Sequence, residues 1–167
     1  MPRPRLSYRE PAMSDDPRPG FDPGPHPGSS SPGVSARMSR LRRRDNGPEL
    51  AVRTRLHARG LRYRVAWPIP GQRRRTIDIA FTRRRLAVFI DGCFWHGCPL
   101  HATSPKANAE WWRRKIETNR ARDADATQQL VELDWTVMRF WEHEAPEEVA
   151  DLIATWLAAE ARRGESR

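Results

Sequence analysis

The chain has 167 residues, 38% of them hydrophobic, so it can form one domain with a substantial core but hardly two. Its formal net charge of +9 favours a polyanionic partner, because Lys and Arg release counterions from phosphates; a merely solvated basic face is the alternative. No apolar run approaches the roughly 18 residues that span a bilayer, and no signal-peptide pattern follows the N-terminal arginines. These features exclude a visible membrane anchor, and we expect a cytoplasmic protein.

The first part of the chain differs in composition from the rest. Residues 1–37 hold nine of the fifteen prolines, with Gly, Ser and Asp between them and few apolar residues. Such a segment cannot bury enough surface to fold, which predicts a disordered arm; a start codon assigned too early, with Met38 as the natural beginning, is the alternative. Residues 38–163 then form the folded domain, and residues 164–167 form a tail.

The predicted domain alternates helices and strands in the order α-β-β-β-α-β-α. Asn46 is a candidate N-cap of the first helix, which Gly60 ends, and Asn108 is a candidate cap of the long second helix. The remaining elements follow from hydrophobic periodicity. We expect strands at 61–67, 75–82, 86–91 and 135–141, a helix from 108 to about 133, and a final helix that begins at Pro146. The short Arg run at 83–85 predicts a hairpin between the second and third strands.

Two carboxylates stand in or next to strands. Asp78 lies inside an apolar run, where Ile77, Ile79 and Phe81 are expected to share one face and Asp78 to occupy the other. An unpaired charge there would cost several kcal/mol unless something binds it. If the two strands are neighbours, Asp91 at the end of the next strand can approach Asp78. Hard oxygen ligands of this kind suit Mg²⁺.

A third carboxylate lies on the first helix. Glu49 precedes Val52 by three residues and Leu56 by seven, which places it on the inward face, where it could reach the same site. Alternatively, Glu49 and Asn46 form a capping box, in which Glu49 only accepts a backbone N–H.

The loop after the third strand carries metal-ligand chemistry. Cys93, Cys98 and His101 form a C-x4-C-x2-H pattern, and His143 could supply a fourth ligand. In a reducing compartment, two such cysteines are more plausible as thiolate ligands than as a disulfide, and a closed Cys2His2 set would hold a structural zinc. Half-buried thiols beside surface histidines are the alternative.

His96 stands between these predicted ligands and is free for proton transfer, since its ordinary pKa is near 6.5; contacting a phosphate or supporting a ligand are the competing roles. Phe94 and Trp95 precede it, and Trp112 stands beside a cationic run at 113–115. Aromatics interleaved with cations can wedge into or stack on nucleic acid bases, and ordinary core packing is the alternative.

Several short motifs together resemble the very-short-patch-repair (Vsr) DNA mismatch endonucleases. They are Met38-Ser-Arg, Pro48-Glu49-Leu50, Ile77-Asp78, Gly92-Cys93-Phe94-Trp95-His96 and Trp141-Glu142. The similarity runs from about Met38 to His143. It implies a restriction-endonuclease-like α/β domain, with a mixed central sheet flanked by helices. It also implies an Mg²⁺-dependent enzyme that nicks DNA 5′ of the thymine in a T:G mismatch, the product of 5-methylcytosine deamination.

The resemblance also implies roles for individual residues. Asp78 would bind Mg²⁺ together with the Ile90 carbonyl oxygen, His96 would be the general base or position the water, and Glu49 would support the site. Three aromatics would enter the duplex beside the mismatch, and two polar residues would line the helix face toward DNA. These DNA-binding residues are Phe94, Trp95, Trp112, Lys115 and Asn119. The family further implies action as a monomer on nucleoid DNA, with mismatch-repair proteins and a cytosine methyltransferase as companions.

The chain departs from the family pattern at the metal sites. Asp91 stands where the best-known pattern has His, and His143 stands where it has Cys. His101 lies one residue beyond the family's second ligand position in this loop. Asp91 could add a metal ligand or take part in proton transfer. The rival functions are a non-catalytic, zinc-stabilised DNA-binding module and a related nuclease that acts on another DNA structure.

Overall fold

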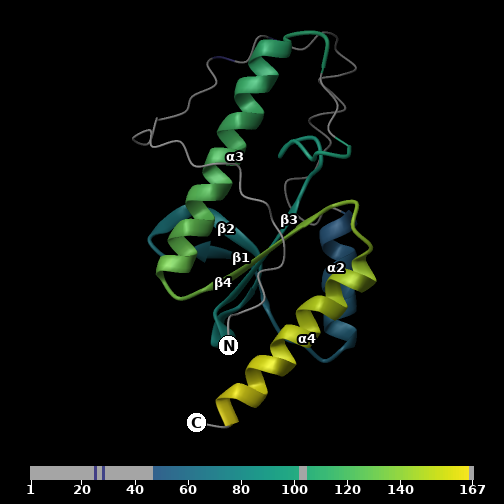
Figure 1. The fold of residues 1–167 in the computed structure, drawn as a ribbon, viewed down its shortest axis with the longest axis vertical. Coiled ribbons are helices and arrows are strands. Elements are labelled where there is room, and N and C mark those ends of the chain that lie inside the picture. The colour runs from purple at the N-terminus through teal and green to yellow at the C-terminus, as the bar shows by residue number, and fades with distance from the viewer. Residues whose placement is uncertain (1–24, 26–27, 29–46, 102–104, 166–167) are drawn as a thin grey trace.

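The predicted order of elements is confirmed by the computed structural model, which describes residues 25, 28, 47–101 and 105–165 (Figure 1). The predicted arm, Met38 and the Asn46 cap lie outside these residues, apart from two isolated positions in the arm. The helices and strands are α2 (Gly47–Ala58), β1 (Arg64–Ile69), β2 (Gln72–Phe81), β3 (Leu86–Asp91), α3 (Ala109–Glu132), β4 (Thr136–Trp141) and α4 (Pro146–Glu165). A short 3-10 helix, Thr82–Arg84, makes the predicted turn between β2 and β3.

The four strands form one mixed sheet in the order β1-β2-β3-β4. β1 pairs with β2 and β2 with β3 in antiparallel fashion, which confirms the predicted hairpin. β3 and β4 are parallel, and α3 is the crossover between them, as a parallel pair requires.

Apolar side chains cover both faces of the sheet, and β3 is buried at all six positions. One face packs against α2 and α4 through Val52, Leu56, Val149, Ile153 and Leu157. The other face packs against α3 through Ala126 and Leu130. The helices are thus divided between the two faces, and the sheet is the middle layer.

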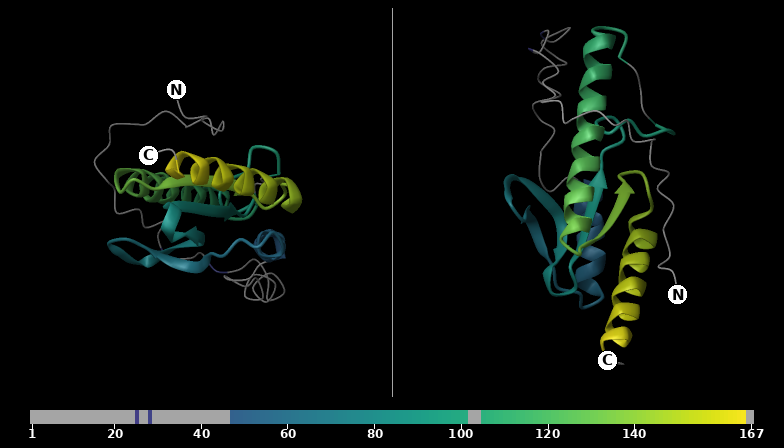
Figure 2. Two further views of the ribbon diagram at one scale, coloured as in Figure 1. Left: turned by 90° about the horizontal axis from the view of Figure 1, so that it is seen from below. Right: turned by 60° about the vertical axis from the view of Figure 1, so that its left-hand side comes forward.

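α3 is the element that reaches the predicted site. Its C-terminal half packs on the sheet, and its N-terminal half projects beyond the strands beside the loop that follows β3 (Figures 1 and 2). Asn108 stands at the predicted cap position, but its φ is 56° and its side chain makes no capping hydrogen bond. No helix in the described part of the chain is long and apolar enough to cross a membrane.

The sheet is irregular at Asp78. The β2–β3 ladder ends at the Ile79–Val88 pair, and the position opposite Asp78 on β1 is Ala66, whose φ is 48°. An Ala in this left-handed region costs about 1–2 kcal/mol, so the surrounding structure must hold the backbone at Ala66 in this conformation. We refer to the irregular pairing at Ala66 and Asp78 as the bend. The prediction that Ile77 shares a face with Ile79 is wrong, because Ile77 packs in the α3 cluster and Ile79 in the α2/α4 cluster.

Candidate active site and metal cluster

The bend at Asp78 places its carboxylate between two strands. Asp78 Oδ2 accepts a hydrogen bond from the Ile90 N–H at 2.9 Å. Burial, together with the charges of Glu49 and Asp91, raises the pKa of Asp78 to about 7, against the opposing effects of the Ile90 hydrogen bond and Arg139. Asp78 therefore lies within electrostatic range of two further carboxylates. A buried carboxylate in such surroundings fits a hard divalent cation, which would supply the missing positive charge.

Glu49 lies on the inward face of α2, within electrostatic range of Asp78. It is 7% exposed, and Arg53 lies one turn further along the helix, with its Nη1 3.3 Å from Glu49 Oε1. The predicted inward placement of Glu49 is confirmed. The alternative capping box involves Asn46, which lies outside the described residues.

Asp91 has a cationic partner that the sequence did not suggest. Arg139 on β4 donates two hydrogen bonds to it, from Nε to Oδ2 at 2.8 Å and from Nη2 to Oδ1 at 2.6 Å. The same guanidinium lies over the Phe89 ring, 4.6 Å from its centroid. Both Asp91 oxygens thus accept hydrogen bonds from one arginine, which neutralises the carboxylate and leaves each oxygen one lone pair.

His96 also has a partner from a distant element. Its Nδ1 is hydrogen-bonded to Asp123 Oδ2 on α3, and Asp91 Oδ1 lies 3.8 Å from the same nitrogen. Burial lowers the pKa of His96, but the hydrogen bond and charge of Asp123 and the charge of Asp91 outweigh this effect, so the pKa is raised. Because Nδ1 is engaged, Nε2 is the ring nitrogen left to exchange a proton.

The four predicted zinc ligands come together in space. One ligand atom from each of Cys93, Cys98, His101 and His143 lies within 4.8 Å of the others. Cys93 Sγ is 3.1 Å from His143 Nδ1, and burial together with the neighbouring Cys98 raises the pKa of Cys93 to about 11. Two thiols and two imidazoles fit a tetrahedral zinc site, and a bound cation would convert the thiols to thiolates.

Three side chains from other elements hold the loop at residues 92–98. Glu142, in the predicted Trp-Glu motif after β4, accepts the Cys93 N–H at 2.6 Å. From α3, Asn119 donates to the Trp95 carbonyl at 2.8 Å, and Arg120 donates to the carbonyls of His96 and Gly97. Asn119 was expected to face DNA, and in the structure its amide supports the loop.

Three predicted DNA-binding aromatics form a cluster of their own. Phe94, Trp95 and Trp112 are half-buried, and their ring centroids lie 5.1–5.8 Å apart. None of the three belongs to either core cluster of the described residues. They lie between the metal-cluster loop and the projecting half of α3, on which Lys115 is also half-buried.

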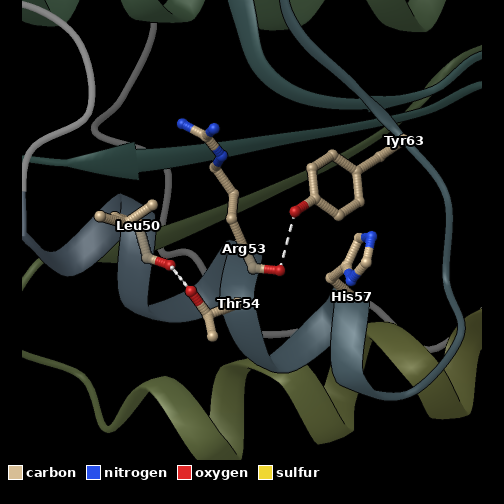
Figure 3. A pocket seen from close by; sticks show the side chains of 5 residues that line it. All are labelled: Leu50, Arg53, Thr54, His57 and Tyr63. Atoms are coloured by element: carbon tan, nitrogen blue, oxygen red, sulfur yellow. Dashed lines mark hydrogen bonds between the residues drawn. The ribbon is translucent and has the colours of Figure 1, made fainter.

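A shallow hollow of about 240 Å³ on the outer side of α2 is separate from these groups (Figure 3). Leu50, Arg53, Thr54, His57 and Tyr63 line it. The Tyr63 hydroxyl donates to the Arg53 carbonyl at 2.7 Å, which ties the segment before β1 to α2. The hollow contains no carboxylate or thiol, and its residues help to fix the helix that carries Glu49.

Asp123 and Arg139 are the residues that the sequence analysis missed. Asp123 lies four residues after Asn119 and eight after Lys115, on one side of the helix, and this spacing was the available signal. Arg139 had no comparable signal, since an Arg in a short strand is ordinarily a solvent-facing residue.

Comparisons with known proteins show the family to which the chain belongs. The family model described as DNA mismatch endonuclease Vsr matches residues 32–101. Type II nicking enzyme V.NaeI of Lentzea aerocolonigenes is 40% identical over 134 residues, which cover 78% of each chain. Type II nicking enzyme V.XorIIP of Xanthomonas oryzae is 41% identical over 64% of this chain and 77% of its own. DNA mismatch endonuclease Vsr of Escherichia coli is 33% identical over 65% of this chain and 68% of its own.

Proposed function

This chain belongs to the Vsr family of DNA mismatch endonucleases, and we propose that it nicks double-stranded DNA on the 5′ side of the thymine in a T:G mismatch. Its relatives are DNA-nicking enzymes, which supports DNA as the partner and hydrolysis as the reaction. The finer assignments proposed here are a restriction-endonuclease-like fold, Mg²⁺ dependence and T:G specificity.

The observation that carries the proposal is the placement of Asp78. Its carboxylate sits at a break in the sheet, next to the Ile90 main chain and within electrostatic range of Glu49. Isolated buried carboxylates are costly, and a purely structural Asp would not be kept beside two further acids. We propose that Asp78 and the Ile90 carbonyl hold Mg²⁺, with Glu49 supporting them.

Each group at the site then has a chemical task. A divalent cation at Asp78 would supply Lewis-acid chemistry, neutralising charge on the phosphate and activating water. His96, oriented through Nδ1 by Asp123, would move a proton at Nε2. Asp91, paired with Arg139, would act by fixing the surroundings of His96.

The aromatic cluster would recognise the mismatch. Phe94, Trp95 and Trp112 would enter the duplex, because a mispaired step is easier to unstack than a paired one. Lys115 would face the DNA backbone, and Asn119 would act through the Trp95 carbonyl that it holds. The net charge of +9 supports binding to phosphates.

The cysteine–histidine cluster would hold zinc rather than react. A closed Cys2His2 set leaves no open coordination position, so its task would be to fix the loop that carries the aromatics and His96. We propose a monomer on DNA that cooperates with mismatch-repair proteins in the cytoplasm, at the nucleoid.

A panel of labelled duplexes tests this function. Duplexes that differ only in one pair, T:G, T:A or C:G, in several flanking contexts, are incubated with the protein and Mg²⁺, and both binding and strand cleavage are measured. The proposal predicts a nick in T:G duplexes alone. Tight binding without cleavage in any context would identify a DNA-binding module, and cleavage that ignores the mismatch would indicate another nuclease activity.

A further inference from the structure

Arg139 links two carboxylates that lie on different elements. On β4, its neighbours Met138 and Phe140 pack in the α2/α4 core, so by strand alternation Arg139 projects to the opposite face, toward α3. There its guanidinium bonds to both oxygens of Asp91, and its Nη2 lies 3.1 Å from Asp123 Oδ1. The other oxygen of Asp123 holds His96.

These contacts form a chain that ends at the proposed proton-transfer group. Arg139 fixes one oxygen of Asp123, and Asp123 presents its second oxygen to His96 Nδ1. With its carboxylate held at one oxygen, Asp123 has little rotational freedom at the other. The orientation of the imidazole therefore depends on a side chain that does not touch it in this structure.

The burial of Arg139 argues against a purely structural role. Its side chain is 11% exposed, and Nη1 is buried with no hydrogen-bond partner among the described residues. A buried ion pair contributes little net stability compared with apolar side chains of similar volume, and an unmet donor lowers that contribution further. For stability alone, apolar residues in place of Arg139 and its two carboxylate partners together would serve as well, so the charged set points to another task.

We propose that Arg139 is a positioning residue of the nuclease site, which fixes His96 through Asp123 while it neutralises Asp91. This inference rests on the proposed function for its kinetic consequence, but its geometric consequence can be measured without DNA. It assigns Arg139 a task in orienting the reacting histidine, distinct from metal binding and from DNA contact.

The geometric consequence is tested by ¹⁵N NMR of histidine-labelled protein at about pH 8.5, where an unperturbed imidazole is neutral. The His96 signal is identified by its loss in His96→Gln. In the wild type, we expect the proton on Nδ1, toward Asp123. In Arg139→Gln, we expect the signal to move toward the mixed tautomers of a free histidine. An unchanged His96 tautomer in the folded variant would overturn the proposal.

The kinetic consequence is tested by nicking assays of the same variants. Arg139→Gln should lower kcat about 100-fold with KM within about threefold, the size expected when a reacting group is misplaced by about 1 Å. Arg139→Lys should recover part of kcat, because it keeps the charge but cannot bridge both carboxylates. If Arg139→Gln does not fold, Arg139→Lys serves for both readouts. An unchanged kcat would overturn the proposal.

Arg75 provides a matched control. It also joins a strand to an aspartate of α3, with Nη1 2.6 Å from Asp125 Oδ2, but its partners on α3, Asp125 and the Arg122 carbonyl, lie outside the site. Arg75→Gln should leave both the His96 tautomer and kcat near wild type. If the wild type nicks no duplex, the proposed function fails, and the NMR result still decides whether Arg139 positions His96.

Discussion

The Asp78 carboxylate accepts the Ile90 N–H at 2.9 Å, at the point where the β2–β3 ladder ends. A side chain thus replaces a main-chain acceptor between two neighbouring strands. This arrangement brings a carboxylate next to the Ile90 backbone and keeps the Ile90 N–H satisfied inside the sheet. The bend at Ala66 on β1 lies opposite the same residue.

Asp78→Asn should separate catalysis from folding. The amide keeps an oxygen that can accept the Ile90 N–H but cannot bind a cation as a carboxylate does. We expect kcat to fall at least about 1,000-fold, equivalent to roughly 4 kcal/mol of transition-state stabilisation, with the Kd for DNA little changed. Nicking kinetics and DNA binding measured on the same samples check this; near-wild-type kcat would contradict it.

The raised pKa of Asp78 predicts a pH dependence of stability. The ordinary pKa of an Asp carboxyl is 3.8, and the pKa of Asp78 in the fold is about 7. The stability that the protonated group contributes is therefore fully present below about pH 4 and is lost as the pH rises through about 7. Without added Mg²⁺, the Tm of the wild type relative to Asp78→Asn should fall over this range.

Added Mg²⁺ should raise the Tm of the wild type relative to Asp78→Asn above pH 7, because a bound cation stabilises the ionised carboxylate. Comparing the two proteins removes the contribution of every other titrating group. A difference in Tm that does not change with pH would show that burial does not disfavour the ionised form of Asp78.

The fold was largely predictable, because hydrophobic periodicity is recorded in neighbouring residues. The bend at Asp78 was not, since Ala66 is not a residue that ordinarily adopts a positive φ. This bend is why the predicted common face of Ile77 and Ile79 is wrong.

The candidate site was predictable where its chemistry is local in the sequence. The cysteines and histidines that the structure brings together were recognised from their spacing, with His143 the one distant member. Asp123 and Arg139 act through partners 27 and 48 residues away, and no local pattern reports such a pairing. Long-range ion pairs are fixed by tertiary packing alone.

Loss of one cysteine–histidine ligand should release the metal. Cys98→Ser is expected to abolish stoichiometric zinc and lower the Tm, because the loop at 92–98 loses its cross-link. His57→Ala is the matched control, since His57 lines the hollow on α2. Zinc content by elemental analysis and thermal unfolding check this. Equal zinc in wild type and Cys98→Ser would exclude the site.

Gly97→Ala should displace the loop from α3. Gly97 has φ 65°, and an added Cβ would lie 2.6 Å from Arg120 Nη2 and 2.8 Å from Ile116 Cγ2. Backbone strain and steric overlap together should cost about 2–5 kcal/mol. Gly60→Ala is the control, because Gly60 has φ 76° but open space around it. Equal losses of Tm in the two variants would show that the contact with α3 is unimportant.

Trp95→Ala should weaken discrimination between mismatched and paired DNA. Stacking on a base contributes about 1–3 kcal/mol, so the Kd for a T:G duplex should rise about 5- to 150-fold, with a smaller change for T:A. Trp67→Ala is the control, because Trp67 is 38% exposed on β1, away from the aromatic cluster. Fluorescence anisotropy with both duplexes measures this. An equal loss for T:G and T:A would assign Trp95 to general binding.

Strand-resolved mapping of the cut tests the central claim most directly. A T:G duplex labelled on either strand is incubated with the wild-type protein and Mg²⁺, and the products are sized at single-nucleotide resolution. The proposed function predicts one cut, on the thymine strand and immediately 5′ of the mispaired thymine, with the guanine strand intact. Cuts on both strands, or a cut at the same position in a T:A duplex, would contradict it.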